Sequence, residues 1–235
     1  MISAFLLPSL TFGAIAHVQT MANDANAGTT NIQTFGLAST TGDLIVVGAD
    51  WGDTTTPTLT VTDSNNNTYT SLQYEISSDG NRAAQLFYAK NITGGATPIT
   101  ITATLTASAV DHFEVYVSEY SGLDLGNPAD QSSEATGSGA TANSGSKTTN
   151  FSNELIYCYI QDGTVTKTEA GFTARSTFNA NLVQDDIVSS TGTYQCTANV
   201  TSVNTDIMAT FKAPSTTTSS SIAGNSTIAG NSIIN

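Results

Sequence analysis

The sequence predicts an all-β fold, an antiparallel β-sandwich, and three observations support this prediction. Short segments in which apolar and polar residues alternate run along the 235-residue chain, as in residues 111–120 (DHFEVYVSEY). Thr, Ser, Asn and Gly fill the intervals between these segments, and no segment has the period of a helix. The hydrophobic content of 39% is enough to bury a core when the apolar residues alternate.

The alternation predicts thirteen strands between residues 15 and 212. They are 15–20, 31–35, 43–51, 58–62, 68–76, 83–90, 99–106, 111–121, 154–161, 172–178, 182–189, 193–201 and 206–212. Asn- and Gly-rich turns join several of them, for example DSNNN at residues 63–67, because Asn and Asp tolerate positive φ and form Asx turns.

Two sheets packed face to face would bury one set of alternating residues from each strand. The expected core includes Leu44, Val46, Leu86, Tyr88, Phe113, Val115 and Val117. Residues 132–149 (SSEATGSGATANSGSKTT) contain few apolar residues, so we expect a long surface excursion there, with at most one weak strand.

The two ends of the chain differ in composition from this predicted domain of residues 14–213. Residues 1–13 are apolar and read as an N-terminal arm, although a cleaved signal peptide is an alternative because an Ala14-x-Ala16 site follows. Residues 214–235 form a polar linker and a six-residue repeat, IAGNST followed by IAGNSI. Three chains could bury Ile222, Ile228 and Ile234 around a common axis; a disordered tail that happens to repeat is the alternative.

Charge restricts the classes of partner. Six Lys and Arg residues against nineteen Asp and Glu residues give a net charge of −13, so we expect neither nucleic acid nor an anionic membrane surface as a partner. Two cysteines, Cys158 and Cys196, each fall in a predicted strand. A disulfide and two buried free thiols are equally compatible with the sequence.

The residues that could carry catalysis do not converge in the sequence. Of the two histidines, His17 and His112, the second neighbours Asp111, which a strand would point to the opposite face. Glu114 shares a face with Tyr116 and Tyr120, and no second strand offers an obvious partner carboxylate for a glycosidase pair. We therefore expect no enzyme and no cofactor, and a surface or interface role for His112.

Metal and sugar sites are the remaining possibilities. Asp63, Asn65 and Asn67 have the spacing that opens a calcium loop, but Thr68 and Tyr74 stand where Gly and Glu would be needed, so a hairpin turn is favoured. Exposed aromatic residues stack on sugars, which makes Trp51, the only tryptophan, a glycan-binding candidate together with Tyr116, Tyr120 and Glu114. A core position for a lone tryptophan is the alternative.

Several segments resemble a family of uncharacterised all-β proteins found in bacteriophages and environmental bacteria. They are AIAHVQT (14–20), TTGDLIVVGADW (40–51), PTLTVTDSNNNTYT (57–70), LFYAKNITGG (86–95), VSEYSGL (117–123), NELIY (153–157), GFTAR (171–175) and MATFKA (208–213). The resemblance implies a jelly-roll-like sandwich, often with a role on the virion surface or in glycan binding, and it brings no catalytic residues.

These observations together predict a virion structural protein, such as a capsid decoration, head-fibre or tail-fibre module on the particle surface. The expected partners are further copies of the chain, with a homotrimer favoured, other virion proteins such as the major capsid or tail protein, and a polysaccharide. The alternative is a secreted carbohydrate-binding module or adhesin.

Overall fold

The computed structural model describes residues 13–52, 57–109, 111–161 and 170–215. Within these ranges the chain is built from β-strands with one short 3₁₀ helix, which confirms the predicted all-β class. The elements are β1 Ala16–Asp24, β2 Thr30–Thr34, β3 Leu44–Gly52, β4 Leu59–Asp63, β5 Thr70–Ile76, β6 Arg82–Ala89, β7 Thr100–Leu105, β8 Phe113–Ser121, β9 Ala129–Gly137, β10 Thr141–Asn143, β11 Lys147–Thr148, β12 Glu154–Gln161, β13 Thr173–Ser176, η1 Phe178–Ala180, β14 Leu182–Val188, β15 Thr193–Tyr194, β16 Thr197–Asn199 and β17 Asn204–Lys212. No helix in the described part of the chain is long and apolar enough to cross a membrane.

The first eight strands form a jelly roll. The central sheet has the order β1-β8-β3-β6-β5, and a smaller sheet of order β2-β7-β4 packs against it. From β1 to β4 the chain alternates between the two sheets, and β8 returns to lie beside β1, which is the strand order of a jelly roll. One strand departs from that order, because β5 pairs with β6 at the edge of the central sheet instead of with β4.

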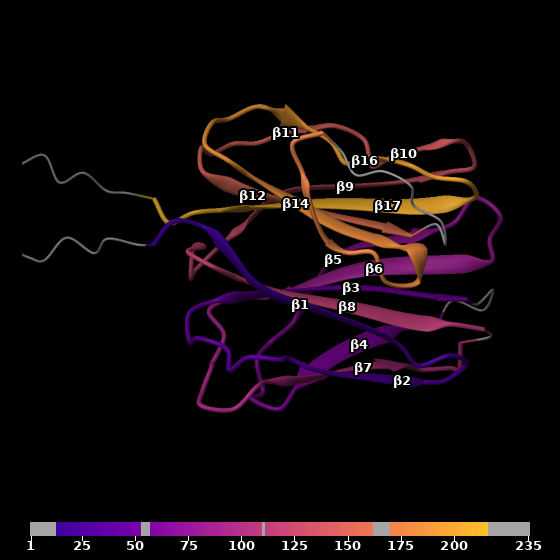
Figure 1. The fold of residues 1–235 in the computed structure, drawn as a ribbon, viewed down its shortest axis with the longest axis horizontal. Coiled ribbons are helices and arrows are strands. Elements are labelled where there is room, and N and C mark those ends of the chain that lie inside the picture. Colours follow the sequence, from indigo (N-terminus) through magenta and orange to yellow (C-terminus); the bar gives the residue numbers. More distant parts are fainter. Residues whose placement is uncertain (1–12, 53–56, 110, 162–169, 216–235) are drawn as a thin grey trace, which may run out of the picture.

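The rest of the chain adds a third sheet, so the molecule has more layers than the predicted two-sheet sandwich (Figure 1). This sheet, β13-β14-β12-β17-β9, covers the other face of the central sheet. The predicted core residues are all buried, but in two cores: Phe113, Val115 and Val117 face the small sheet, whereas Leu44, Val46, Leu86 and Tyr88 face the third sheet.

Coverage on both faces explains the sequences of the two middle strands. Every residue of β3 is buried, and so is every residue of β8 except the last. β3 accordingly has a nearly continuous apolar run that Asp50 interrupts, whereas β8 buries Glu114, Ser118 and Glu119 among its apolar and aromatic residues. At Gly48 a Cβ atom would lie 3.0 Å from the Tyr159 ring, so this glycine lets the third sheet pack closely on β3.

Residues 132–149 are not a surface excursion, which corrects that prediction. β9 is a nine-residue edge strand that pairs with β17 from Asn204 opposite Gly137 to Phe211 opposite Ala129, with a register shift between Ala209 and Phe211. The rest of the range contains the short strands β10 and β11, which pair with β16 and β15. Two other predicted strands are shorter or divided: 172–178 becomes β13 followed by η1, and 193–201 becomes β15 and β16.

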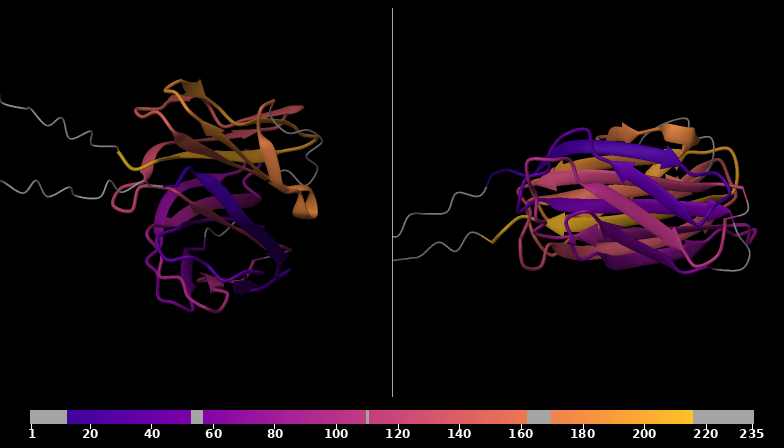
Figure 2. Two further views of the ribbon diagram at one scale, coloured as in Figure 1. Left: turned by 60° about the vertical axis from the view of Figure 1, so that its left-hand side comes forward. Right: turned by 90° about the horizontal axis from the view of Figure 1, so that it is seen from below.

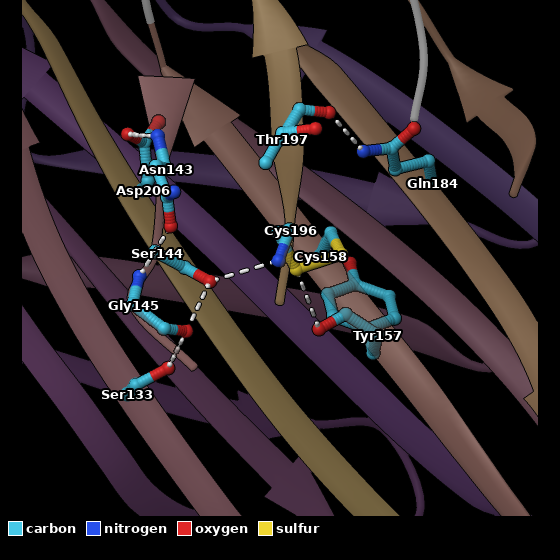
Figure 3. Close-up of a disulfide and its surroundings, with 10 residues drawn as sticks. All are labelled: Ser133, Asn143, Ser144, Gly145, Tyr157, Cys158, Gln184, Cys196, Thr197 and Asp206. Atoms are coloured by element: carbon cyan, nitrogen blue, oxygen red, sulfur yellow. Dashed lines mark hydrogen bonds between the residues drawn. A yellow bond between two sulfur atoms is a disulfide. The ribbon is translucent and has the colours of Figure 1, made fainter. Parts of the chain in front are cut away.

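A disulfide fastens an outer layer to the third sheet (Figure 3). Cys158 lies on β12 and Cys196 lies between β15 and β16; their Cα atoms are 5.7 Å apart and both side chains are fully buried. The backbone N–H of Cys196 donates to Ser144 Oγ at 3.0 Å, so the same bridge region also holds the segment that leads from β10 to β11. Of the two states that the sequence allowed, the structure has the disulfide.

Both ends of the described chain leave the same end of the sandwich (Figure 1). Ala14 lies against Gly122, where a Cβ atom would contact the Ala14 carbonyl oxygen at 2.5 Å, and the backbone N–H of Asp124 donates to the carbonyl oxygen of Lys212 at 3.0 Å. We call this the proximal end. The opposite, distal end contains the last residues of β3 and β12 and the first residues of β8 and β14.

Candidate functional site

A cluster of polar side chains, most of them buried, lies at the distal end between the central and third sheets. Its centre is a pair of carboxylates on neighbouring strands, Asp50 of β3 and Glu114 of β8, which lie opposite one another in the strand register. Asp50 is completely buried and Glu114 is 6% exposed. We call Asp50, Glu114, His112, Asn179, Asn181, Tyr116 and Tyr159 the distal polar cluster.

Asp50 is held by groups from three segments. The Tyr159 hydroxyl of β12 donates to its Oδ1, and Asn181 Nδ2 donates to the same oxygen at 3.2 Å. Its Oδ2 lies 3.1 Å from His112 Nε2, an ion pair when the imidazole is protonated. Burial of a charged carboxylate is costly unless it is paired and hydrogen-bonded, and these contacts offset that cost.

Glu114 is held mainly by the segment around η1. Asn181 Nδ2 donates to its Oε2 at 2.6 Å, Asn179 Nδ2 donates to its Oε1 at 3.0 Å, and the Tyr116 hydroxyl lies 2.8 Å from Oε2. Asn179 and Ala180 have φ values of 46° and 62°, the left-handed region that non-glycine residues seldom adopt. The strained turn is therefore maintained by the hydrogen bonds that its asparagines make to the carboxylates.

His112 connects the cluster to the surface. It precedes β8, so it is not on a strand, and Asp111 does not point away from it: Asp111 Oδ1 lies 2.7 Å from His112 Nδ1. The prediction that the two side chains diverge was wrong for that reason. A Cβ atom at Gly52 would overlap the Asp111 carboxylate, which explains why β3 ends in glycine here.

Burial and neighbouring charges shift the proton equilibria of this cluster. Burial acts to lower the pKa of His112, but the hydrogen bond and charge of Asp50, with the charges of Asp111 and Glu114, raise it to about 9. Burial, together with the charge of Asp50, raises the pKa of Glu114 to about 7. At neutral pH the cluster thus contains an imidazolium at His112 and, at Glu114, a carboxyl group close to its midpoint.

Two further carboxyl groups, at the proximal end, also have a raised pKa. Burial raises the pKa of Asp43 to about 7, aided by its hydrogen bond to Glu119, and burial raises the pKa of Glu154 to about 7. A group whose pKa is raised by folding stabilises the fold below its unfolded pKa, and this contribution is lost as pH rises through the folded value. Folding raises the pKa of these carboxyls and of His112 alike, so the free energy of unfolding should decrease as pH rises from about 5 to about 9.

The structure does not support the predicted sugar-stacking face. Trp51, Tyr116 and Tyr120 are each 0% exposed. The third sheet covers the face of the central sheet that carries Tyr116 and Tyr120, and the small sheet covers the opposite face, which carries Trp51. The Tyr120 hydroxyl donates to Asp185 at 2.7 Å, inside the molecule. Of the glycan-binding candidates, Glu114 and Tyr116 belong to the distal polar cluster, where Glu114 accepts hydrogen bonds from two asparagines.

Most residues of the cluster were not predicted from the sequence. Glu114 does have a partner carboxylate on a second strand, Asp50, contrary to the prediction. A signal was present, because Asp50 stands inside the apolar run LIVVGADW and a charged residue in a doubly covered strand needs a buried partner. Nothing in the sequence pointed to Asn179 or Asn181. The oligomerisation candidates Ile222, Ile228 and Ile234 lie outside the described residues.

The Asp63 loop is a turn but not a hairpin, which corrects that prediction, because the strands that it joins belong to different sheets: β4 pairs with β7, and β5 pairs with β6. Asp63 Oδ1 accepts the backbone N–H groups of Asn65 and Asn67 at 2.9 and 3.1 Å, and Oδ2 accepts Tyr69 Oη at 3.0 Å. Within the described ranges, no group of three or more His, Cys, Asp or Glu side chains is placed to hold a metal ion.

Comparison with protein-family models, with curated protein sequences and with solved structures gives no match for this chain.

Proposed function

We propose that this chain is a structural module displayed on the outside of a virion, attached at its proximal end and presenting its distal end outward. One observation carries the proposal: residues 13 and 215 leave the sandwich together, at the end opposite the distal polar cluster. A module attached through both flanking segments at one end leaves the other end free for contact. This arrangement suits a decoration, head-fibre or tail-fibre module.

The layered packing and the disulfide of this fold support an exposed location. Three stacked sheets cover two separate cores, and the Cys158–Cys196 disulfide locks the outer layer. Disulfides persist in oxidising surroundings such as virion and cell surfaces. Jelly rolls are also a frequent choice for viral capsid domains, although a fold by itself does not determine a function.

Assembly into a homotrimer is part of this proposal. In full-length protein, size-exclusion chromatography with light scattering should give the mass of a trimer, and replacing Ile222, Ile228 and Ile234 by Asp should give a monomer. A monomeric full-length chain at high concentration would remove the trimer from the proposal. Mass spectrometry of purified particles tests the virion location: absence of the chain from particles whose genome encodes it would refute that location.

A secreted glycan-binding module is the second candidate, and the chemistry of the distal rim favours it. Asn179 is exposed and its amide bridges Glu114 to Asp24, 3.0 and 3.3 Å away, so amide and carboxylate groups of the kind that bind sugar hydroxyls lie together at the presented end. Tryptophan stacking is not part of this proposal, because Trp51 is buried.

A glycan array tests this candidate with a matched pair of variants. Asn179→Gly removes the amide while tolerating the positive φ, and should abolish any glycan signal. Asn153→Gly is the control, because Asn153 also has a positive φ of 58° but lies at the proximal end. Equal signals from the wild type and both variants would exclude the distal rim as the sugar site.

A further inference from the structure

The outer face of the small sheet carries an ordered array of threonines. Alternate residues of β2, β7 and β4 point away from the core, and seven of these eight are threonine, the eighth being Ile32. We call this set the threonine face: Thr30, Ile32, Thr34, Thr60, Thr62, Thr100, Thr102 and Thr104. The small sheet is the lowest layer in Figure 1, and the right-hand view of Figure 2 looks at the molecule from that side.

The array is regular in two directions. Across the strands, Thr30 is opposite Thr104 and Thr104 is opposite Thr60, while the next row contains Ile32, Thr102 and Thr62. Neither pairing has a bulge, so the rows stay aligned. The side chains therefore repeat at about 4.8 Å between strands and about 6.8 Å along each strand.

The opposite side of this sheet fixes the array in place. Ile101, Ala103 and Leu105 of the middle strand are at most 2% exposed and pack into the core against the central sheet. The side chains of the threonine face are thus set on a backbone that cannot readily deform, and the β-branched threonines are themselves stiff at χ1.

The face is uncharged in a chain with a net charge of −13. The edge strands β5 and β9 do carry acids, for example Glu75 at a half-buried position and Glu134 at an exposed one. Exposed threonines in strands can reflect β propensity alone, but propensity does not explain a face that is free of charge on all three strands.

Four of the seven threonine hydroxyls are available to a ligand. Thr34 and Thr100 hydroxyls bond to one another at 3.0 Å, and Thr60 Oγ1 donates to the Thr104 carbonyl oxygen at 3.3 Å. The hydroxyls of Thr30, Thr62, Thr102 and Thr104 have no hydrogen-bond partner among the described residues.

The chemistry of the face restricts its partner. The buried centre of a protein interface is enriched in aromatic residues, Met and Arg, whereas Ile32 is the one large apolar side chain in the array and no aromatic residue or Arg is present. A sugar would be recognised by aromatic, amide or carboxylate groups, and the array contains none. What it offers is a fixed, neutral lattice that alternates methyl groups and hydroxyls. The complementary surface is itself neutral, periodic and made of hydrogen-bonding oxygen atoms.

We propose that the threonine face binds ice. Its hydroxyls would join the oxygen lattice of an ice surface, and its methyl groups would fill the spaces between lattice waters. Because the array has only three strands, and each strand is rotated by about 20–25° from the next, the matched area is small. The expected effect is therefore inhibition of ice recrystallisation instead of a large depression of the freezing point.

Ice itself is the probe in the test. Full-length protein carrying a fluorescent label should be enriched in a slowly growing ice hemisphere, whereas an inert labelled protein should be excluded. Thr102→Lys, at the centre of the array, should abolish enrichment and recrystallisation inhibition. Thr70→Lys is the matched control, because Thr70 is an exposed strand threonine on β5, outside the array, and should behave as the wild type.

Three outcomes would overturn the proposal: exclusion of the wild-type protein from ice, equal enrichment of Thr102→Lys, or loss of enrichment in both lysine variants. Circular dichroism and thermal unfolding check each variant, and Thr62→Lys at the exposed edge strand replaces Thr102→Lys if the latter does not fold. Binding to crystalline cellulose or chitin that Thr102→Lys removes, without enrichment in ice, would assign the face to a polysaccharide and refute the assignment to ice.

Discussion

The disulfide should contribute a large share of the stability of this protein. Cys158 and Cys196 are 38 residues apart, so the bridge closes a loop of about that length in the unfolded chain. The loop-closure relation gives a stabilisation of about 4 kcal/mol for this length. For a chain of this size, a loss of that magnitude lowers Tm by about 8–16 °C.

Reduction isolates this effect from packing. A reductant that acts on the unfolded chain leaves both sulfur atoms in place, so the buried contacts with Ile156 and Met208 stay available to the refolded protein. Thermal unfolding should therefore be compared after refolding with and without reductant. The Cys158→Ala/Cys196→Ala variant should melt at or below the reduced wild type, because it also loses packing volume.

Equal melting temperatures of the oxidised and reduced wild type would refute the predicted stabilisation by the disulfide. A thiol assay in denaturant adds an independent check: the oxidised chain should present no reactive thiol, and the reduced chain should present both. Reactive thiols without reduction would show that the two cysteines are not bonded to one another.

Three other changes should have measurable effects. The unfolding temperature should fall as pH is raised from about 5 to about 9, because folding raises the pKa of Glu114 to about 7 and that of His112 to about 9; a rising or flat profile would contradict this. Trp51→Ala should destabilise the fold by about 3–5 kcal/mol in denaturant unfolding, since the side chain is fully buried; a change near zero would indicate an exposed tryptophan. Gly48→Ala should cost about 1–3 kcal/mol by the same measurement, because the new Cβ would lie 3.0 Å from the Tyr159 ring, whereas Gly139→Ala, with open space around it, should be near neutral.

The sequence predicted strands well where one face of the strand is buried and apolar and the other is exposed and polar. β4 (LTVTD) alternates buried and exposed residues along its length, and its predicted range differs from the observed one by one residue at each end. β9 (ADQSSEATG) has no such alternation: only one of its nine residues is buried, and its position is determined by pairing with β17. Pairing of this kind is a property of two distant segments, so no local pattern in β9 could reveal it.

The contrast between local alternation and contacts between distant segments also explains which parts of the candidate site could be predicted. Alternation correctly placed Glu114, Tyr116 and Tyr120 on one face of β8, yet it could not show whether that face meets solvent or another sheet. The covering sheet is formed by residues 129–212, and its strand β12 supplies Tyr159 to Asp50 while the η1 turn supplies Asn179 to Glu114. A carboxylate in a strand covered on both faces requires partners from the covering layer. A charged residue inside an otherwise apolar run, as at Asp50, is therefore the local sign in this chain that a second layer carries complementary polar groups.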